Sequence, residues 1–467
     1  MIHASVFING EICKVADYFP VINPATAEVF AMVPRCESAQ LESAVTAAAQ
    51  AFKGWQQDSQ QRRLALTKMA EIIRDNSETL ALLLTQEQGK PLKQARSEVI
   101  SAVLQIQMAA SLELPQEVLQ DTEQHFIKLI RKPYGVVAAI VPWNFPVSIA
   151  MGKVATALLA GNTVVLKPSP YTPLTTLKIA ELTRAVFPSG VFNTLSGLDE
   201  LGAQLIQHPL VSKIDFTGSV TTGKKIAAAA APDLKRITLE LGGNDPAIVL
   251  PDAEPEDIAK AVFWGAFTNS GQVCVAIKRL YVHETRAEAL LQALAELARS
   301  TPVGNGLDEQ VRLGPINNET QFERVRNLIE TAKQHGARVV AGGEALSQGY
   351  CFQPTILSNL SDDEAVVVQE QFGPVLPVLT YRELDDAIAR ANNSHYGLGA
   401  SLWSANVEVA TALAERLEAG TTWVNQHLAL TPLAPFGGCK WSGLGVINGR
   451  WGLEGATQMQ VINVKRS

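Results

Sequence analysis

Short apolar runs that alternate with helical patterns restrict the fold of this chain more than any other feature of its sequence. The runs VVAAIV (136–141), TVVLK (163–167), VFNTL (191–195), KIDFT (213–217) and ITLEL (237–241) are separated by segments with apolar residues at helical spacing. Strands that alternate with helices are typical of βαβ units, whose strands form a parallel sheet. The pattern therefore predicts an α/β fold.

A second series of strands and helices follows Gly243. AIVL (247–250) precedes a helix that begins at Pro255, a favoured first helical position. Because 467 residues are too many for one small core, we expect a second α/β unit with its own sheet, bounded by the turn LGGNDP (241–246). Its later strands are expected at 279–282, 375–381 and 421–424, and its later helices from about Thr285 and about Thr320.

The remaining segments have patterns of their own. Residues 38–113 are mostly helical, and the pattern from Arg62 predicts one helix that ends at Gly89. The segment 116–132 interrupts the first α/β unit and is expected to be extended. The tail TQMQVINVKRS can form another strand.

Charge and composition exclude several classes of function. A net charge of −7 offers no basic excess to neutralise nucleic acid. Five cysteines without paired spacing indicate reduced thiols, and seven scattered histidines make no zinc pattern, so no metal is expected. The N-terminus does not resemble a signal peptide, and prolines, asparagines and a lysine interrupt the most apolar stretch (134–166), so no membrane span is predicted. We expect a cytoplasmic protein.

Glu240 and Cys274 are the first candidates for chemistry. Glu240 lies near the end of the strand ITLEL, just before two glycines, and sites are built at the ends of parallel strands. Cys274 lies in NSGQVCVAIKR (269–279), after small and polar residues. Taken alone, such a glutamate is more often solvated or ion-paired, and a free cysteine is more often a small core residue.

Asn144 and two glycines are weaker candidates. Asn144 lies in VPWNFP, where two prolines restrict the backbone and suit an amide aimed at a fixed point, although alone it is a loop residue. FTGSVTTGKK (216–225) places Gly218 and Gly223 between a strand and a helix, where backbone N–H groups can face a phosphate. The spacing is not the G-x-G-x-x-G fingerprint, so this signal is weak by itself.

Eight motifs give these residues a common explanation. PWNFP, LKPSPYTP, FTGS, LELGG, GQVC, EQFGPV, NNSHYGL and PFGGCKWSG occur in this order over nearly the whole chain. Together they resemble the aldehyde dehydrogenase superfamily, and the separation of 34 residues between Glu240 and Cys274 also fits. The resemblance implies an aldehyde-dehydrogenase-like fold with two doubly wound α/β domains and a small β oligomerisation element.

The resemblance also implies catalytic roles. Cys274 would attack the aldehyde carbon as a thiolate, and some local stabilisation of the thiolate is expected. The amide of Asn144 and the backbone N–H of Cys274 would hold the oxyanion, where one donor contributes roughly 3 kcal/mol. After hydride transfer, Glu240 would activate the water that hydrolyses the thioester.

For the cofactor, NAD or NADP, the resemblance implies a set of binding residues. Lys167 would reach the adenosine ribose, and Trp143 and Ser219 would lie near the pyrophosphate, on the turn with Gly218 and Gly223. Glu370 and Phe372 would lie near the nicotinamide ribose and ring.

The same resemblance implies domain bounds. Residues 1–115 and 135–242 would form the dinucleotide-binding domain, and 243–441 the catalytic domain. Residues 116–134 and 455–467 would be the oligomerisation strands of a homodimer or homotetramer.

Three positions depart from the family pattern. Many NAD-preferring relatives have a ribose-binding glutamate where this chain has Pro170, so we expect NAD to be used and NADP tolerated. Val446 and Ile447 replace an arginine and a glutamate that are sometimes linked to proton transfer or subunit contacts.

Several functions remain open from the sequence. The leading one is oxidation of an aldehyde to a free acid, and a coenzyme-A-acylating relative or a non-catalytic binding member of the fold are the alternatives. The segment NQHLALTPLA (425–434) lines the substrate entrance in the family, and relatives that act on carboxylated semialdehydes commonly have an arginine there or in the helix VSIAMGKVATALLAG (147–161). Neither segment contains an arginine here. We therefore expect an uncharged apolar aldehyde, with a succinate-semialdehyde-type substrate as the alternative if a cation reaches the site from a distant loop.

Overall fold

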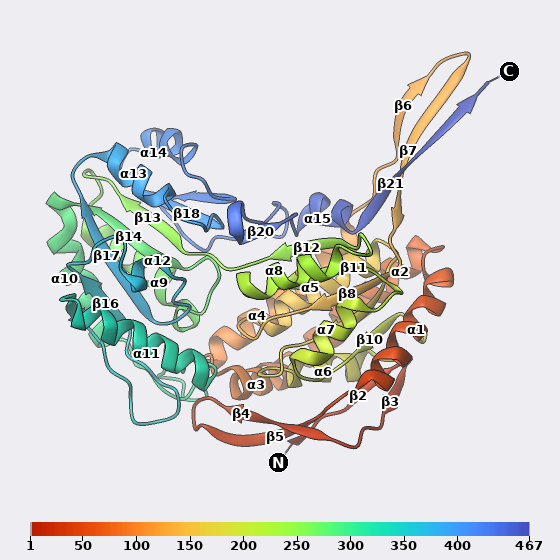
Figure 1. Cartoon of the computed structure of the whole chain (residues 1–467), viewed down its shortest axis with the longest axis horizontal. Helices are drawn as coiled ribbons and strands as arrows, with labels where there is room; N and C mark the ends of the chain where they lie inside the picture. Colours follow the sequence, from red (N-terminus) through yellow and green to blue (C-terminus); the bar gives the residue numbers. More distant parts are fainter. Residues whose placement is uncertain (1, 467) are drawn as a thin grey trace.

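The computed structural model describes residues 2–466, which form two α/β lobes and a projecting arm (Figure 1). The larger lobe contains a sheet with the order β10-β9-β8-β11-β12-β20. All its neighbouring strands pair in parallel except β20, which returns from far along the chain and pairs antiparallel with β12. The α/β fold is thus confirmed. The strands are β8 (Val136–Ile140), β9 (Thr163–Lys167), β10 (Phe192–Thr194), β11 (Val211–Thr217), β12 (Arg236–Glu240) and β20 (Gly443–Leu444).

Helices cover both faces of this first sheet. One face packs with Val137, Ala139 and Leu166 against α2, α4 and α5, and the other packs with Val136, Ala138 and Val165 against α1 and α7. This alternation is the period of two that a strand imposes on its side chains. The helices of the lobe are α1 (Ser38–Trp55), α2 (Ser59–Asp75), α3 (Ser77–Gln88), α4 (Leu92–Ser111), α5 (Pro146–Leu159), α6 (Leu174–Thr183), α7 (Asp199–Gln207), α8 (Val220–Ala230) and α15 (Gly449–Gly455).

The single helix expected from Arg62 to Gly89 is two helices, so that prediction is wrong in this detail. Asn76 separates them: it follows α2, its side-chain amide donates to the carbonyl of Ile72, and α3 begins directly after it. An asparagine side chain that bonds the backbone locally competes with helical pairing, which explains the break.

The smaller lobe contains a sheet with the order β15-β16-β17-β14-β13-β18-β19, parallel except for the β15–β16 pair. Its strands are β13 (Asp245–Val249), β14 (Ile277–His283), β15 (Arg338–Ala341), β16 (Thr355–Ser358), β17 (Val375–Tyr381), β18 (Gly399–Trp403) and β19 (Thr421–Val424). Its helices are α9 (Pro255–Phe267), α10 (Glu284–Ser300), α11 (Glu319–Gln334), α12 (Ala365–Val368), α13 (Leu384–Asn392) and α14 (Val407–Ala414). The second sheet expected after Gly243 is therefore present.

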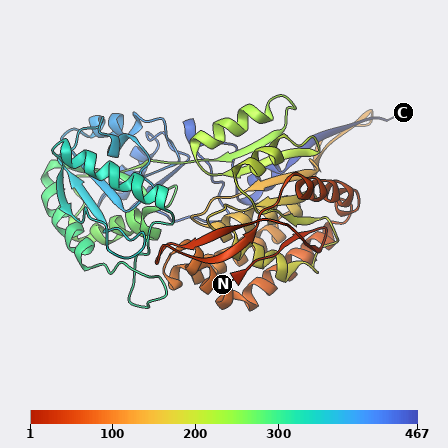
Figure 2. The same cartoon turned by 60° about the horizontal axis from the view of Figure 1, so that its bottom comes forward.

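Strands near the N-terminus were not expected from the sequence. β1 (Ile2–His3), β5 (Glu28–Pro34) and β4 (Tyr18–Asn23) form a small sheet, and β2 (Val6–Ile8) pairs with β3 (Glu11–Cys13). Figure 2 shows these strands along one side of the larger lobe. Because each strand is short and each of the two sheets contains few strands, the alternation of apolar residues in this part of the sequence is too weak to predict them.

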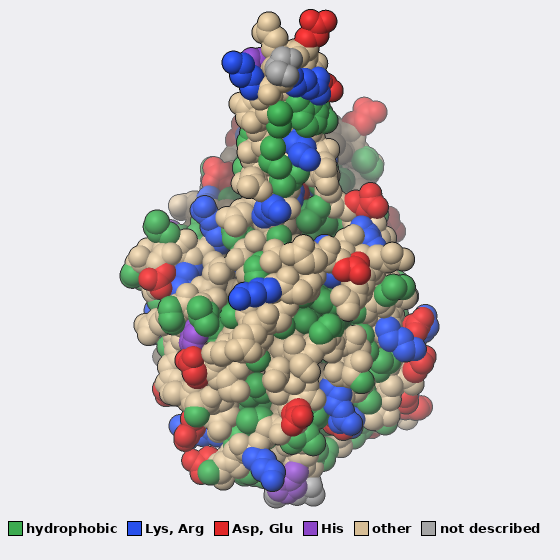
Figure 3. All heavy atoms as spheres, turned by 90° about the vertical axis from the view of Figure 1, so that its right-hand side faces the viewer, with side chains coloured by type: hydrophobic (Ala, Val, Ile, Leu, Met, Phe, Trp, Pro, Cys, Tyr) green, Lys and Arg blue, Asp and Glu red, His purple; other side chains and the backbone are tan. Residues whose placement is uncertain are grey.

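The arm consists of three antiparallel strands in the order β21-β7-β6. They are β6 (Glu117–Asp121), β7 (His125–Pro133) and β21 (Thr457–Lys465). Hydrophobic side chains such as Val118, Met459 and Val461 are more than half exposed on it, and Figure 3 shows apolar groups along its length. None of the helices formed by residues 2–466 is long and apolar enough to cross a membrane.

Candidate active site

The candidate site lies where the carboxyl edge of the first sheet meets the smaller lobe. Because β8, β9, β11 and β12 are parallel, the loops that follow them share one edge. Asn144 follows β8, Lys167 ends β9, Ser219 follows β11 and Glu240 ends β12. The fold thus brings together residues that are up to 96 positions apart in the chain.

Cys274 lies in a tight turn that leads from α9 into β14. Asn269, Ser270 and Gly271 all have positive φ angles, of 51°, 55° and 70°. At Gly271 a Cβ would lie 2.1 Å from the carbonyl oxygen of Gly373, so only glycine fits there. The turn gives Cys274 a fixed place, with part of its surface still open to solvent.

The expected stabilisation of the Cys274 thiolate is largely opposed by its surroundings. Burial of the sulfur and the nearby carboxylates of Glu240, Asp245 and Glu370 raise the thiol pKa well above its usual value. Only a hydrogen bond from the backbone N–H of Val275 acts in the other direction. Without further positive charge, this cysteine is therefore a neutral thiol at pH 7.

Glu240 is buried, with a side-chain oxygen (Oε1) that has no hydrogen-bond partner among residues 2–466. Burial raises its pKa to about 8, the ammonium of Lys153 lowers it, and the carboxylates of Glu370 and Asp215 raise it. Its carboxyl group therefore exchanges its proton near neutral pH, which suits a general base.

Lys153 and Asp215 reach Glu240 because of strand register. Asp215 pairs with Thr238 across β11 and β12, and Thr217 pairs with Glu240, so these side chains share the face that α5 covers. From α5, Lys153 forms a buried ion pair with Asp215. In the sequence, Lys153 is only the lysine that interrupts the apolar stretch 134–166, and no motif pointed to Asp215.

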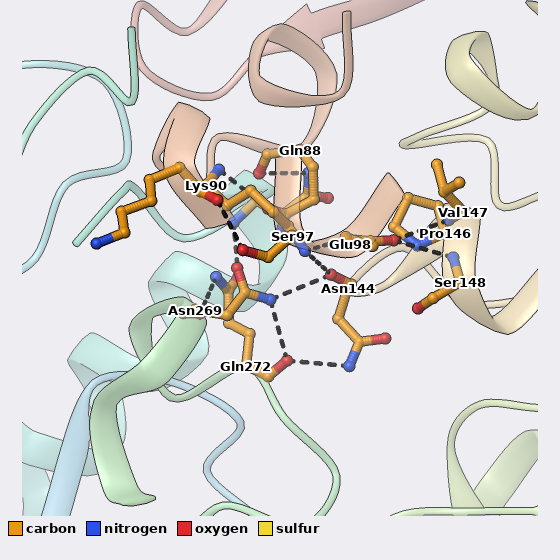
Figure 4. A network of polar contacts seen from close by, with 12 residues as sticks. Gln88, Lys90, Ser97, Glu98, Asn144, Pro146, Val147, Ser148, Asn269 and Gln272 are labelled. Atoms are coloured by element: carbon orange, nitrogen blue, oxygen red, sulfur yellow. Dashed lines mark hydrogen bonds and ion pairs between the residues drawn. The ribbon is translucent and has the colours of Figure 1, made fainter. Parts of the chain in front are cut away.

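A buried polar network holds Asn144 (Figure 4). Its side-chain nitrogen donates to the carbonyl of Gln272 at 2.9 Å, two residues before Cys274. Its own backbone carbonyl accepts from Lys90 Nζ at 2.8 Å and from Asn269 Nδ2 at 3.1 Å. Since an amide nitrogen carries two hydrogens, one anchors the side chain and one stays available for an oxyanion.

The network continues from Lys90 to Glu98 on α4. The two side chains form an ion pair of 2.5 Å and are 0% and 1% exposed. Glu98 also accepts from the backbone N–H groups of Val147 and Ser148 at the start of α5, at 2.9 and 3.3 Å. Lys90 and Glu98 thus tie α4, α5 and the Asn144 loop together, and no motif in the sequence analysis pointed to them.

The residues expected to hold the cofactor lie along the same edge. The rings of Trp143 and Phe372 meet edge to face at 5.3 Å, and Glu370 accepts from the backbone N–H of Gly243 at 3.1 Å. Ser219 caps α8, whose first N–H groups therefore stand at the sheet edge. A Cβ at Gly218 would lie 2.4 Å from the ring of Phe216, and one at Gly223, inside α8, would lie 2.5 Å from the Leu241 side chain, so a larger residue at either position would displace that side chain.

These features fit a dinucleotide. A helix N-terminus in a glycine-containing turn accepts a pyrophosphate, and the buried ammonium of Lys167 has no hydrogen-bond partner among the described residues. An ammonium without a protein partner at the end of a parallel strand can bind a polar group of a ligand.

A cavity of about 550 Å³ lies between α4, the start of α5 and the end of α9. Its wall includes Phe145, the neighbour of Asn144, together with Ser148 and Thr268. No residue of the segment 425–434, which the sequence analysis placed at the substrate entrance, lines it. Two cations from elsewhere, Lys93 and Arg312, do line it.

Comparison with known proteins identifies the family of the chain. The model of the aldehyde dehydrogenase family matches residues 13–462. A probable aldehyde dehydrogenase of a Pseudomonas species is 40% identical over 468 residues, which cover 98% of this chain and 94% of that protein.

Solved structures are also similar over the whole chain. The NAD+ complex of an aldehyde dehydrogenase from Bacillus cereus superposes with a TM-score of 0.97 at 36% identity, covering 100% of this chain and 97% of that one. An NADP-dependent enzyme from E. coli gives a TM-score of 0.97 at 34% identity, covering 99% and 98%.

Proposed function

The chain belongs to the aldehyde dehydrogenase family, and on that premise we propose how its own residues oxidise an aldehyde to a carboxylic acid. That it is an enzyme of this class using NAD or NADP follows from the family and from its structural relatives. The roles of individual residues and the preferred substrate are the proposal. The observation that carries it is the anchored amide of Asn144 at the carbonyl of Gln272, beside the turn that holds Cys274.

Cys274 is the nucleophile. Its sulfur loses a proton, attacks the aldehyde carbon and forms a thiohemiacetal, whose oxygen becomes negative. The free hydrogen of the Asn144 amide and the backbone N–H of Cys274 donate to that oxygen. A donor fixed in advance stabilises the developing charge by roughly 3 kcal/mol because it needs no rearrangement.

Trp143, Lys167, Gly218, Ser219, Gly223, Glu370 and Phe372 hold the cofactor. When bound there, NAD(P)+ supplies the acceptor for the hydride that leaves the carbon. Ser219 and the N–H groups of α8 bind the pyrophosphate, and Lys167 binds the adenosine ribose. Glu370, whose carboxylate is fixed by the N–H of Gly243, accepts from the nicotinamide ribose.

Glu240 completes the reaction after oxidation has turned the bound carbon into a thioester. Its unpartnered oxygen accepts a proton from water, the water attacks the thioester carbon, and the carboxylic acid leaves as the thiolate is restored. Retention of this base favours water over coenzyme A as the acceptor of the acyl group.

The favoured substrate is an uncharged, largely apolar aldehyde. Cys274 packs against a cluster of apolar side chains that includes Phe145, Leu428 and Phe436. Each buried methylene contributes roughly 0.8 kcal/mol, so kcat/KM is expected to rise from acetaldehyde to hexanal. Lys93 and Arg312 in the wall of the nearby cavity support the alternative, a substrate with a second carboxylate.

One assay tests both parts of this proposal. NAD(P)H formation is followed with acetaldehyde, hexanal and succinate semialdehyde, each with and without coenzyme A. A higher kcat/KM for hexanal without any need for coenzyme A is expected. A clear preference for succinate semialdehyde would overturn the substrate proposal, and an absolute need for coenzyme A would overturn hydrolysis by Glu240.

We also propose that the arm joins copies of the chain into a homodimer or homotetramer in the cytoplasm. Val118, Leu119, Met459 and Val461 are each more than half exposed on it, and an isolated small sheet is only marginally stable in water. The five cysteines are free, as suits a reducing compartment.

A further inference from the structure

The segment 425–434 contains a buried histidine that has no part in the proposed chemistry so far. The side chain of His427 is 0% exposed, and its ring packs against Trp423 with the ring centroids 4.7 Å apart. Helix α9 also comes close, since a Cβ at Gly265 would lie 3.2 Å from the Cβ of His427. Burial lowers the pKa of this imidazole to about 4, so the ring is neutral at pH 7.

The neutral ring has one hydrogen-bond partner among residues 2–466. Its Nε2 lies 2.6 Å from the backbone carbonyl of Val275, and since a carbonyl only accepts, Nε2 carries the hydrogen. Nδ1 is then a bare acceptor, and no group of the described chain donates to it. Asp245, at the start of β13, has the only acidic side chain in this part of the structure within 4 Å of a ring nitrogen, and its oxygen at 3.8 Å from Nε2 is too far for a hydrogen bond.

The unpaired nitrogen argues that the ring does more than fill space. A buried polar atom without a partner costs stability, and a phenylalanine against Trp423 would fill the same place without that cost. What a phenylalanine lacks is the donor to the Val275 carbonyl. The hydrogen bond to that carbonyl is therefore the property that distinguishes His427 from an apolar residue.

The carbonyl that His427 holds belongs to the turn of the nucleophile. Residues 273–276 form a turn that is closed by a hydrogen bond of 3.1 Å from the N–H of Ala276 to the carbonyl of Val273, with Cys274 and Val275 at its centre. The N–H of Val275 donates to the sulfur of Cys274. Val275 thus contacts the sulfur through its N–H group and His427 through its carbonyl.

We propose that His427 is a positioning residue for Cys274: by holding the carbonyl of Val275 it keeps the N–H of the same residue directed at the sulfur. The inference rests on the proposed role of Cys274 as the nucleophile. A donor that is fixed before the charge develops stabilises an anion more than a mobile one does. His427 thus supports the thiolate in a site whose carboxylates oppose it.

The test measures how fast iodoacetamide alkylates Cys274 between about pH 6 and about pH 10, with the modified peptide identified by mass spectrometry. His427→Phe keeps a ring against Trp423 and removes the donor. Its Cys274 should react about tenfold more slowly near pH 8, with a raised apparent pKa, because a hydrogen bond to the thiolate is weakened. The kcat/KM for hexanal should fall by a similar factor, while calorimetry finds an unchanged affinity for NAD+. His427→Gln should stay within about threefold of the wild type, because its side-chain nitrogen lies as many bonds from Cβ as Nε2 does.

The matched control is His208→Phe at the end of α7 in the larger lobe. His208 is also buried, with a side chain that is 7% exposed and lies 3.0 Å from Glu42, and its loss should leave the alkylation of Cys274 unchanged. If His427→Phe does not fold, His427→Asn takes its place with the same expected loss, because its amide nitrogen is one bond too short to reach the carbonyl of Val275.

Two results would overturn the inference. One is an alkylation rate and pH profile equal to those of the wild type in the variant that lacks the donor. The other is an equally large loss in His427→Gln, since the hydrogen bond would then not be what positions the turn. A wild-type protein that still oxidises hexanal after complete alkylation of Cys274 would instead overturn the proposed role of Cys274.

Discussion

Glu98→Gln is expected to lower the free energy of unfolding far more than the loss of an ion pair on the molecular surface. The variant keeps the size of the side chain and the oxygen that accepts from Val147 and Ser148, and removes the charge that pairs with Lys90. The ammonium of Lys90 is then left in a fully buried place, with the carbonyl of Asn144 as its remaining acceptor. Breaking one partner of a buried pair typically costs about 3–5 kcal/mol.

The matched control is Glu78→Gln on the neighbouring helix α3. Glu78 accepts two hydrogen bonds from Arg96, at 2.8 and 2.6 Å, but the two side chains are 58% and 50% exposed. Exposed pairs contribute about 0–1 kcal/mol, so the control should be close to the wild type. The free energy of unfolding is measured by urea titration with both far-UV and fluorescence signals.

The double variant Lys90→Met/Glu98→Gln separates stability from activity. Because no buried charge is left alone, the double variant should recover most of the stability that Glu98→Gln loses. The kcat of the double variant should nevertheless lie below that of the wild type, because the hydrogen bond from Lys90 that fixes the Asn144 loop is absent. If Glu98→Gln costs no more than Glu78→Gln, or if the double variant is no more stable than Glu98→Gln, the reasoning about this network is wrong.

Five further expectations follow from the proposed chemistry and assembly. Cys274→Ala should abolish aldehyde oxidation and leave NAD+ binding intact by calorimetry; substantial turnover would exclude Cys274 as the nucleophile. Glu240→Gln should give a pre-steady-state burst of NADH followed by slow turnover, whereas a wild-type steady rate would show that another base acts. Because the ionised form of Glu240 is the base and its pKa is raised to about 8, kcat should rise with pH through about pH 8 and then level off. Lys153→Met, which removes the cation that lowers this pKa, should move that rise to higher pH, and an unchanged profile would contradict the assignment. Light scattering at micromolar concentration should find a dimer or tetramer, and a monomer would exclude the proposed role of the arm.

The sequence predicted the two sheets because their strands carry a strong signal. Buried parallel strands are nearly continuous apolar runs, and TVVLK and VVAAIV are recognisable without knowledge of their neighbours. The N-terminal strands were missed because runs of two to seven residues, with polar residues between them, resemble loops. The break at Asn76 was missed because its neighbours on both sides have strong helical periodicity, and only its side-chain bond to Ile72 ends the first helix.

Residues of the candidate site could be predicted where one short motif contains them. They could not be predicted where their role depends on contacts between two distant segments of the chain. Asn144 and Glu240 could be named from their motifs, but the partners that hold or tune them come from other elements. Lys90 and Glu98 resemble ordinary surface charges at the start of a helix, and nothing in their local pattern shows that both are buried. Asp215 had a signal that could have been used, since a charge inside the apolar run KIDFT needs a buried partner.

The charges around Cys274 disfavour the thiolate that the proposed reaction needs. The carboxylates of Glu240, Asp245 and Glu370 raise the thiol pKa, and Glu370 raises the pKa of Glu240 as well. Each carboxylate therefore disfavours ionisation of its acidic neighbours. The Cys274 thiol and the Glu240 carboxyl must nevertheless both be ionised during one turnover. A positive charge that arrives beside them would lower both pKa values together, and would do so only when the site is filled. The same repulsion thus favours the neutral thiol until a positive charge is bound, and a neutral thiol reacts more slowly with other electrophiles.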